Sequence, residues 1–198
     1  MKYPPPHHQD HDKEHMIEVV KQYPLATVIS VLDGSPLVTH MPLIYREADG
    51  KLIGHIDIYN PQTPLMKDNN DITVIFSGPQ CYISPTVYTT TQLPTWNYIK
   101  VHLKGKVIAI ESKEALKQSL ITMTEFLEQP EHQYILEPDN PRMEAALDYI
   151  KMFEITIHEW EGKFKLSQDK KTADTSNARD ELIRANQQSI KAFLDKVF

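Results

Sequence analysis

Residues suited to contacting a planar, polar-edged ligand are concentrated in the run PTWNYIKVH at residues 94–102. Just upstream, residues 78–85 read GPQCYISP. A flat ligand needs aromatic or apolar contact on its face and hydrogen bonds around its rim. Packing alone does not require this mixture of aromatic, amide and imidazole groups. The two segments therefore indicate a binding site for a planar ligand.

Two further segments carry groups that suit the same ligand. Residues 39–43 (THMPL) form an expected strand in which Pro42 cannot donate a ladder hydrogen bond, so the strand is interrupted or lies at an edge. Free backbone groups of an edge strand can bond the rim of a ring; an ordinary edge strand is the alternative. His55, Asn60 and Gln62 collect at a strand-to-loop junction that suits a phosphate, although Asn-Pro is by itself a turn sequence.

Other chemistry receives less support from the sequence. The aromatic residues also suit a core or an interface, and His102 on a strand is more often structural. His11 and His15 are four residues apart, as metal ligands on one helix face would be, but with His7 and His8 they fit a solvated N-terminus better, and no metal site is expected. Neither a nucleophile elbow nor a cationic neighbour of Cys81 appears, so a hydrolase or a reactive thiol is not supported.

The composition is that of an ordinary globular domain. The 198 residues are 40% hydrophobic and 24% charged, with a net charge of −6 that argues against a general nucleic-acid surface. The single cysteine excludes an internal disulfide framework and suits a reducing compartment. We see no signal peptide and no apolar run of the roughly 20 residues that span a bilayer. A cytoplasmic protein without a membrane segment is expected.

Hydrophobic periodicity and turn residues predict the elements that position these groups. Helices are expected over 10–22, 112–127, 141–150 and 174–198, with one helical turn at 65–67. Strands are expected over 25–32, 36–45, 51–59, 72–76, 82–84, 101–110 and 153–157. Asp33-Gly34 is a hairpin turn sequence, and Ser112 and Asn140 precede helices as capping residues. Short antiparallel strands at this spacing favour a small barrel over a βαβ sheet, and no Gly-rich turn indicates a Rossmann site.

Five segments, in this order and spacing, resemble the PaiB-type family of FMN-binding negative transcriptional regulators. They are THMPL at 39–43, GH at 54–55 with NPQ at 60–62, GPQCYISP at 78–85, PTWNY at 94–98 with VHLKG at 101–105, and KLSQ at 165–168. The resemblance implies a mainly β fold with added helices, an antiparallel FMN-binding split β-barrel like that of pyridoxamine-phosphate oxidase. It also implies a single domain over 1–198, with a helical insert at about 112–151 and a C-terminal helix at about 174–198.

The same resemblance implies a homodimer with FMN bound at the subunit interface. By analogy with the fold, the strand at 39–43 lines the flavin ring, the junction residues hold the phosphate end, and residues of the later segments close the site. The cofactor-binding residues implied in this way are Thr39, His40, Met41, Pro42, Leu43, His55, Asn60, Gln62, Tyr82, Ser84, Trp96, Asn97 and Lys165. The chain departs from the family pattern at Cys81, Thr63, Val87 and Asp169, where the family favours a small residue, Trp, Trp and Asn.

Three functions are compatible with these residues. The first is an FMN-binding transcriptional repressor, which contacts DNA, if at all, through the basic residues of the helix at 174–198. Those residues are Arg179, Arg184, Lys191 and Lys196, and they alternate with acids, as on a solvated face. The second is an FMN-dependent oxidoreductase acting on a small molecule. The third is a protein that binds haem or another planar ligand on the same barrel through His40, His55 or His102.

Overall fold

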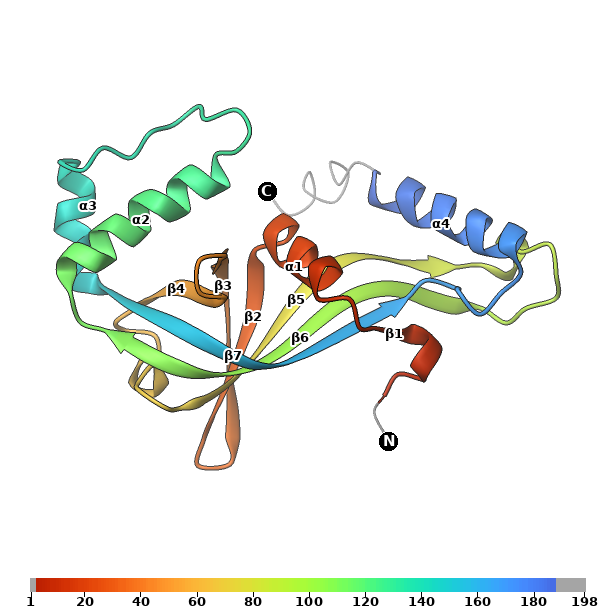
Figure 1. Ribbon diagram of the computed structural model, residues 1–198, viewed down its shortest axis with the longest axis horizontal. Coiled ribbons are helices and arrows are strands. Elements are labelled where there is room, and N and C mark those ends of the chain that lie inside the picture. The colour runs from red at the N-terminus through yellow and green to blue at the C-terminus, as the bar shows by residue number, and fades with distance from the viewer. Residues whose placement is uncertain (1–2, 188–198) are drawn as a thin grey trace, which may run out of the picture. The chain divides into compact units, whose positions relative to one another are not determined.

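The computed structural model describes residues 3–187 as seven strands and four α-helices with short 3₁₀ turns (Figure 1). The strands are β1 (Gln9–Asp10), β2 (Leu25–Leu32), β3 (Ser35–Arg46), β4 (Lys51–Asp57), β5 (Asp71–Ile83), β6 (Thr95–Ile110) and β7 (Ile150–Lys165). The helices are α1 (Lys13–Gln22), α2 (Lys113–Leu127), α3 (Pro141–Ala146) and α4 (Thr172–Asn186). The 3₁₀ turns are η1 (Pro6–His8), η2 (Thr63–Leu65), η3 (Pro85–Val87) and η4 (Leu147–Tyr149).

The strands form one sheet that closes on itself. Their order is β1-β7-β4-β3-β2-β5-β6, and an additional pairing between β7 and β6 joins the two ends of the six larger strands. Strand β1 adds to the outer edge of β7, with Gln9 opposite Lys163. The pairs β2–β3, β2–β5, β3–β4 and β4–β7 are antiparallel. This closure confirms the predicted antiparallel barrel.

The chain divides into two compact units, each built from separate stretches of sequence. Unit 1 comprises Met1–Asp12, Ser77–Lys100 and Glu161–Phe198, and unit 2 comprises Lys13–Phe76 and Val101–Trp160. Strands β5, β6 and β7 each contribute residues to both units. The expectation of one domain over 1–198 stays a prediction.

Local sequence explains the hairpins of unit 2. Asp33 and Gly34 both have positive φ, +50° and +79°, which is what the two-residue turn between β2 and β3 requires. Gly50, at φ +70°, turns the chain from β3 into β4. Alternation along β2 then places Ala26 and Val28 in the core. The register of β3 therefore follows from a short, well-specified turn.

The core of unit 2 is made by the inward faces of these strands. Alternation along β6 leaves Val101, Leu103 and Val107 buried while Lys104 and Lys106 are exposed. Phe153 and Ile155 of β7 are buried in the same unit. Burying a side chain of this size contributes roughly 1.5–3 kcal/mol, so each residue of this layer stabilises the barrel.

The helical insert of unit 2 begins and ends where the sequence indicates. Ser112 caps α2 by accepting a hydrogen bond from the Ala115 amide, and Asn140 caps α3 through the Arg142 and Met143 amides. The two helices follow one another between the end of β6 and the start of β7 (Figure 1). Their apolar faces pack with residues of β3, β4 and β7 in one cluster: Ile44, Ile53, Leu116, Met123, Met143, Leu147 and Met152.

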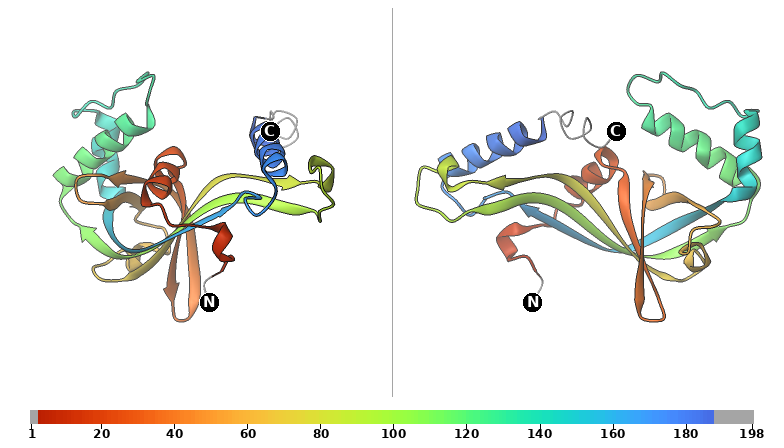
Figure 2. Two further views of the ribbon diagram at one scale, coloured as in Figure 1. Left: turned by 45° about the vertical axis from the view of Figure 1, so that its right-hand side comes forward. Right: turned by 180° about the vertical axis from the view of Figure 1, so that it is seen from behind.

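In unit 1, α4 packs on the strand segments that belong to this unit. Ala178 and Leu182 form a buried cluster with Cys81, Ile83 and Tyr88, and both views of Figure 2 show α4 beside these strand ends. The helix is fixed at its start by Asp174, whose buried carboxylate accepts hydrogen bonds from the Thr89 amide and the Thr89 and Thr90 hydroxyls at 2.5–2.8 Å. The hydrogen bond from Thr90 is the main reason why the pKa of Asp174 lies below its ordinary value.

Three predicted strands are longer in the structure. The strands expected at 72–76 and 82–84 are one strand, β5, because Gly78-Pro79 is accommodated without interrupting it. Strand β6 begins at Thr95, six residues before the strand expected at 101–110. Strand β7 runs from Ile150 to Lys165, well beyond the strand expected at 153–157. Backbone pairing with neighbouring strands overrides the local turn sequence in each case.

Helix α4 ends at Asn186, and the rest of the predicted closing helix, with Lys191 and Lys196, lies outside the described residues. Within residues 3–187, none of the helices has the length and apolar character needed to span a bilayer.

Candidate functional site

In unit 2, three predicted site residues meet beside strand β3. The Asn60 side chain accepts a hydrogen bond from the backbone N–H of Gln62 (2.8 Å) and donates one to the Thr39 hydroxyl (3.1 Å). Gln62 lies almost fully buried and donates through Nε2 to the Ser30 hydroxyl at 2.9 Å, with longer contacts to the Val28 and Leu37 carbonyls. We call Thr39, Asn60 and Gln62 the amide cluster.

The amide cluster contains an unsatisfied acceptor. Among the described residues, Gln62 Oε1 and Asn97 Nδ2 are the buried side-chain polar atoms that have no hydrogen-bond partner. Leaving such an atom unpaired costs about 1–3 kcal/mol, so a buried polar atom without a partner is a candidate for binding a ligand. Both atoms belong to residues that the sequence resemblance assigns to the flavin site. An acceptor such as Gln62 Oε1 fits a ring N–H at the rim of a flavin.

Strand β3 has a free edge beside the amide cluster. Residues 35–42 pair with β2, while the pairing with β4 begins only at Leu43. Within the described chain, the second side of residues 35–42 has no paired strand, which agrees with the edge strand expected from Pro42. His40 is exposed and contacts the Thr27 hydroxyl at 3.1 Å, whereas Met41 and Leu43 are buried and Pro42 is half-buried.

His55 does not join the amide cluster. It lies largely buried under the helical insert, and its Nε2 contacts the Ser119 hydroxyl of α2 at 2.6 Å. Ser119 in turn donates to the Leu116 carbonyl at 2.8 Å or to the Met152 sulfur at 3.3 Å. Burial lowers the pKa of His55 to about 4, so the ring is neutral at neutral pH. The contacts described for His55 are structural, and none involves Asn60 or Gln62.

The other five predicted residues lie in unit 1 and separate into smaller groups. Tyr82 and Trp96 are half-exposed and lie together, with ring centroids 6.4 Å apart. Asn97 is buried and accepts from the Ser167 hydroxyl at 3.1 Å, which also contacts the Tyr88 hydroxyl at 2.8 Å. Ser84 caps the turn η3.

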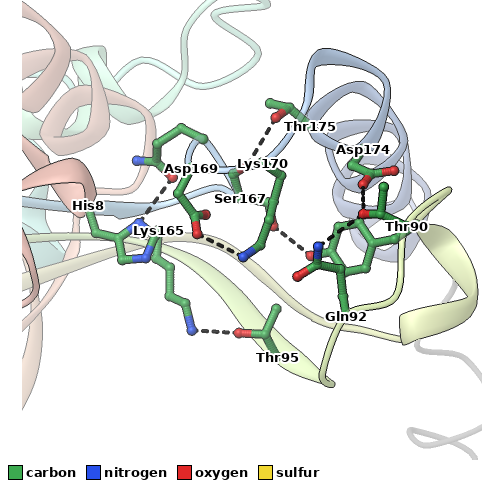
Figure 3. Close-up of polar contacts among 12 residues, drawn as sticks. His8, Thr90, Gln92, Thr95, Lys165, Ser167, Asp169, Lys170, Asp174 and Thr175 are labelled. Carbon is green, nitrogen blue, oxygen red and sulfur yellow. Dashed lines mark hydrogen bonds and ion pairs between the residues drawn. The ribbon is translucent and has the colours of Figure 1, made fainter.

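A pocket of about 290 Å³ lies entirely within unit 1 (Figure 3). Lys165 extends along it and donates to the Thr95 hydroxyl at 2.6 Å. Sequence reasoning named Lys165 but missed most of the other lining residues, which come from three distant stretches of chain. The pocket is lined by His8, Tyr88, Gln92, Leu93, Pro94, Thr95, Lys165, Ser167, Asp169 and Lys170.

The polar end of this pocket is built on the KLSQ run. Gln168 accepts hydrogen bonds at Oε1 from the Leu166 amide (2.7 Å) and contacts His8 Nδ1 (3.2 Å). Lys170 pairs with Asp169 at 2.8 Å. His8 is buried rather than solvated, which corrects the expectation for the N-terminal histidines, and its burial lowers its pKa. No local sequence pattern links His8 to Gln168, which lies 160 residues later, so only the fold brings them together.

Comparison with solved structures agrees with this architecture. The FAD and heme binding protein from Mycobacterium smegmatis superposes with a TM-score of 0.64 at 19% identity, covering 80% of this chain and 73% of that one. The flavocytochrome Anf3 from Azotobacter vinelandii gives a TM-score of 0.63 at 19% identity, covering 79% and 69%. The fold thus defines the class of architecture: the protein is a split β-barrel.

Sequence comparison gives the family. The model of the family described as "Putative FMN-binding domain" matches residues 2–159, and the chain belongs to that family. The protein is also 28% identical over 183 residues to "Protease synthase and sporulation protein PAI 2" of Bacillus subtilis, which covers 91% of this chain and 88% of the relative. The predicted PaiB-type resemblance is confirmed, and FMN is the cofactor that the family assigns.

The residues of unit 2 fit one part of that cofactor. The free edge of β3 and the unpaired Gln62 Oε1 suit the hydrogen-bonding rim of the ring. The amide cluster carries no positive charge, so the charge of a phosphate has to be met by other groups. Lys165 is the one cation among the thirteen predicted residues apart from the histidines.

Proposed function

We propose that this protein binds FMN at the free edge of β3 and acts as a regulator of the repressor type. The observation that carries the FMN proposal is the amide cluster, in which a buried Gln62 Oε1 has no partner within the described chain. FMN, when bound, supplies redox chemistry that the protein only positions. The regulatory part rests on the PaiB-type resemblance and on the similarity to a relative named for sporulation.

In this proposal, each group has a defined task. The backbone of residues 39–43 bonds the rim of the ring, and Gln62 accepts from it. Asn60 holds Gln62 and Thr39 in place through its two hydrogen bonds. Trp96, Asn97, Lys165, Tyr82 and Ser84 remain proposed as cofactor-binding residues, some of them supplied by the partner chain. His55 is bonded to Ser119 and has no part in the proposed phosphate site.

Removing the Thr39 hydroxyl tests the amide cluster. We expect Thr39→Val to weaken FMN binding by roughly three- to tenfold, since one hydrogen bond contributes about 0.5–1.5 kcal/mol. Titration of FMN-free protein, followed by quenching of flavin fluorescence, measures the change. Thr156→Val, which removes an exposed hydroxyl from β7, is the matched control and should leave the affinity unchanged. Equal effects of the two substitutions would place the flavin elsewhere.

A homodimer is proposed through the exposed face of β2 and β3. Leu25, Val31 and Val38 are 63%, 60% and 53% exposed, and the register places them on one face of the hairpin. Apolar side chains gathered in this way on a sheet favour association with a second surface. A second copy of this chain is the partner implied by the resemblance.

We expect the double substitution Val31→Asp and Val38→Asp to convert the dimer to a monomer, because four carboxylates would meet in an apolar contact. Analytical ultracentrifugation measures the change. Ile135→Asp, at a 70% exposed position of the helical insert, is the control. A wild-type protein that sediments as a monomer at all concentrations would contradict the proposed homodimer.

Direct contact with DNA receives little support from the described part of α4. Arg179 lies 3.5 Å from Asp180, and Arg184 pairs with Glu181, so both cations are offset by neighbouring acids. A gel-shift titration at two salt concentrations decides the point, because contacts to phosphate weaken steeply with salt. If DNA binding disappears at near-physiological salt, the protein does not repress by direct contact with DNA, and regulation would have to act through another protein.

An FMN-dependent oxidoreductase is the second candidate. It is favoured by the pocket in unit 1, where an organic molecule has about 290 Å³ of space next to Lys165 and the Tyr88 and Ser167 hydroxyls. Bleaching of the bound flavin by NAD(P)H would support it. A haem site through His40, His55 or His102 is less favoured, because His55 Nε2 is already engaged with Ser119.

A further inference from the structure

Three potential metal ligands meet beside the pocket of unit 1. His7 and His8 come from the turn η1, and Asp169 follows the KLSQ run more than 150 residues later. One ligand atom from each residue lies within 4.8 Å of the other two. His7 and Asp169 are exposed, while His8 is 7% exposed. Two imidazoles and one carboxylate are a donor set that first-row transition metals prefer.

The hydrogen bonds of Gln168 fix which nitrogen of His8 is available. Gln168 Nε2 donates to the Phe164 carbonyl, and its Oε1 accepts from the Leu166 amide at 2.7 Å, so the amide cannot be reversed. Oε1 is therefore an acceptor for His8 Nδ1, 3.2 Å away, and Nδ1 must carry the proton. In the neutral ring, Nε2 then holds a free lone pair. Histidine ligands of metals are usually oriented by such a bond from the other nitrogen.

The carboxylate of Asp169 is held in a similar way. Lys170 contacts Oδ2 at 2.8 Å, which leaves Oδ1 to serve as a ligand. His8, Asp169 and Lys165 all line the pocket, and Figure 3 shows the three side chains near one another. The nearby lysines weaken a bound cation by repulsion, so the site is expected to prefer a metal that bonds strongly to imidazole over Mg²⁺ or Ca²⁺.

From these contacts we infer that His7, His8 and Asp169 form a binding site for a divalent transition metal, with Zn²⁺ as the commonest such ion for imidazole ligands. In a tetrahedral site, bonds of about 2.0–2.2 Å place the donor atoms roughly 3.3–3.6 Å apart. The three donor atoms, now within 4.8 Å of one another, therefore have to approach by up to about 1.5 Å. Rotation of the exposed His7 and Asp169 side chains supplies that movement, because His8 is the fixed member. Three protein ligands leave a position open for water or for a molecule in the pocket.

Calorimetric titration of the full chain without a histidine tag tests the site, with Zn²⁺, Co²⁺ and Mg²⁺ as probes. We expect one Zn²⁺ or Co²⁺ to bind per chain, visible absorption bands for tetrahedral or five-coordinate Co²⁺, and no saturable binding of Mg²⁺. Asp169→Asn and His8→Phe should each weaken Zn²⁺ binding by about tenfold or more. Circular dichroism confirms that the variants are folded.

His11→Ala is the matched control, because His11 is exposed, is close in sequence and lies outside the cluster. It should leave the affinity unchanged. Zn²⁺ binding that survives Asp169→Asn and His8→Phe, or that is lost in His11→Ala, would overturn the inference in favour of surface histidines. Absence of binding to the folded wild-type chain would also overturn it. None of these readings depends on whether FMN is bound.

Discussion

Replacing Gly105 with alanine is expected to destabilise the protein by about 3 kcal/mol, the upper end of the usual cost of overpacking. A Cβ atom at this position would lie 2.4 Å from a side-chain carbon of Ile155 and 2.7 Å from the Thr156 carbonyl oxygen. The carbonyl belongs to strand β7 and cannot rotate away as a side chain can. Gly105 thus allows β6 to approach β7 within unit 2.

Urea unfolding followed by circular dichroism measures this effect. Gly78→Ala on β5 is the control, since a Cβ there meets the side chain of Ile99 at 3.1 Å, which needs a smaller adjustment. We expect this control to cost about 1 kcal/mol. Equal losses for the two substitutions would mean that the strands separate easily at Gly105 and that the close approach is not essential.

Acidification from pH 6.5 to pH 4 is expected to remove about 3 kcal/mol of stability through His55 alone. The pKa of His55 is about 4 in the folded protein because the ring is buried, against 6.5 ordinarily. Between these values the unfolded chain binds a proton that the folded chain does not, so unfolding becomes easier as the pH falls. The stabilisation is fully present above pH 6.5.

His55→Gln separates this contribution from that of the carboxylates. Glutamine can still donate to Ser119 but does not titrate, so the variant should show a flatter dependence of the free energy of unfolding on pH over this range. Urea titrations at half-unit steps of pH measure the difference between wild type and variant. Parallel curves would show that the ring is protonated in the folded state as easily as in the unfolded chain.

The elements that the sequence predicted best are those governed by short-range rules. The turn at Asp33-Gly34 requires positive φ, and the caps at Ser112 and Asn140 satisfy nearby amides, so each is determined by a few neighbouring residues. Strand β5 was predicted as two pieces because Gly78-Pro79 resembles a turn. Pairing with strands distant in sequence keeps it continuous, and no local pattern contains that information.

In the candidate site too, contacts between residues close in sequence were easier to predict than contacts between distant residues. Asn60 and Gln62 were predicted as one group and Thr39 as part of the ring-lining strand, and the contacts that join the three span only 23 residues of chain. His55 was grouped with them through its nearness in sequence, yet alternation along β4 directs its ring toward Ser119, 64 residues away. Asp174 was not selected at all, because its partners Thr89 and Thr90 lie about 85 residues earlier. Contacts at such separations depend on the closed fold.

An absorbance spectrum of the purified protein, followed by titration of the FMN-free protein with FMN, tests the central claim most directly. We predict that the protein carries visible flavin bands or takes up FMN to saturation, and that Thr39→Val weakens this uptake while Thr156→Val does not. A folded protein that is colourless and does not take up FMN at any concentration tested would contradict the account.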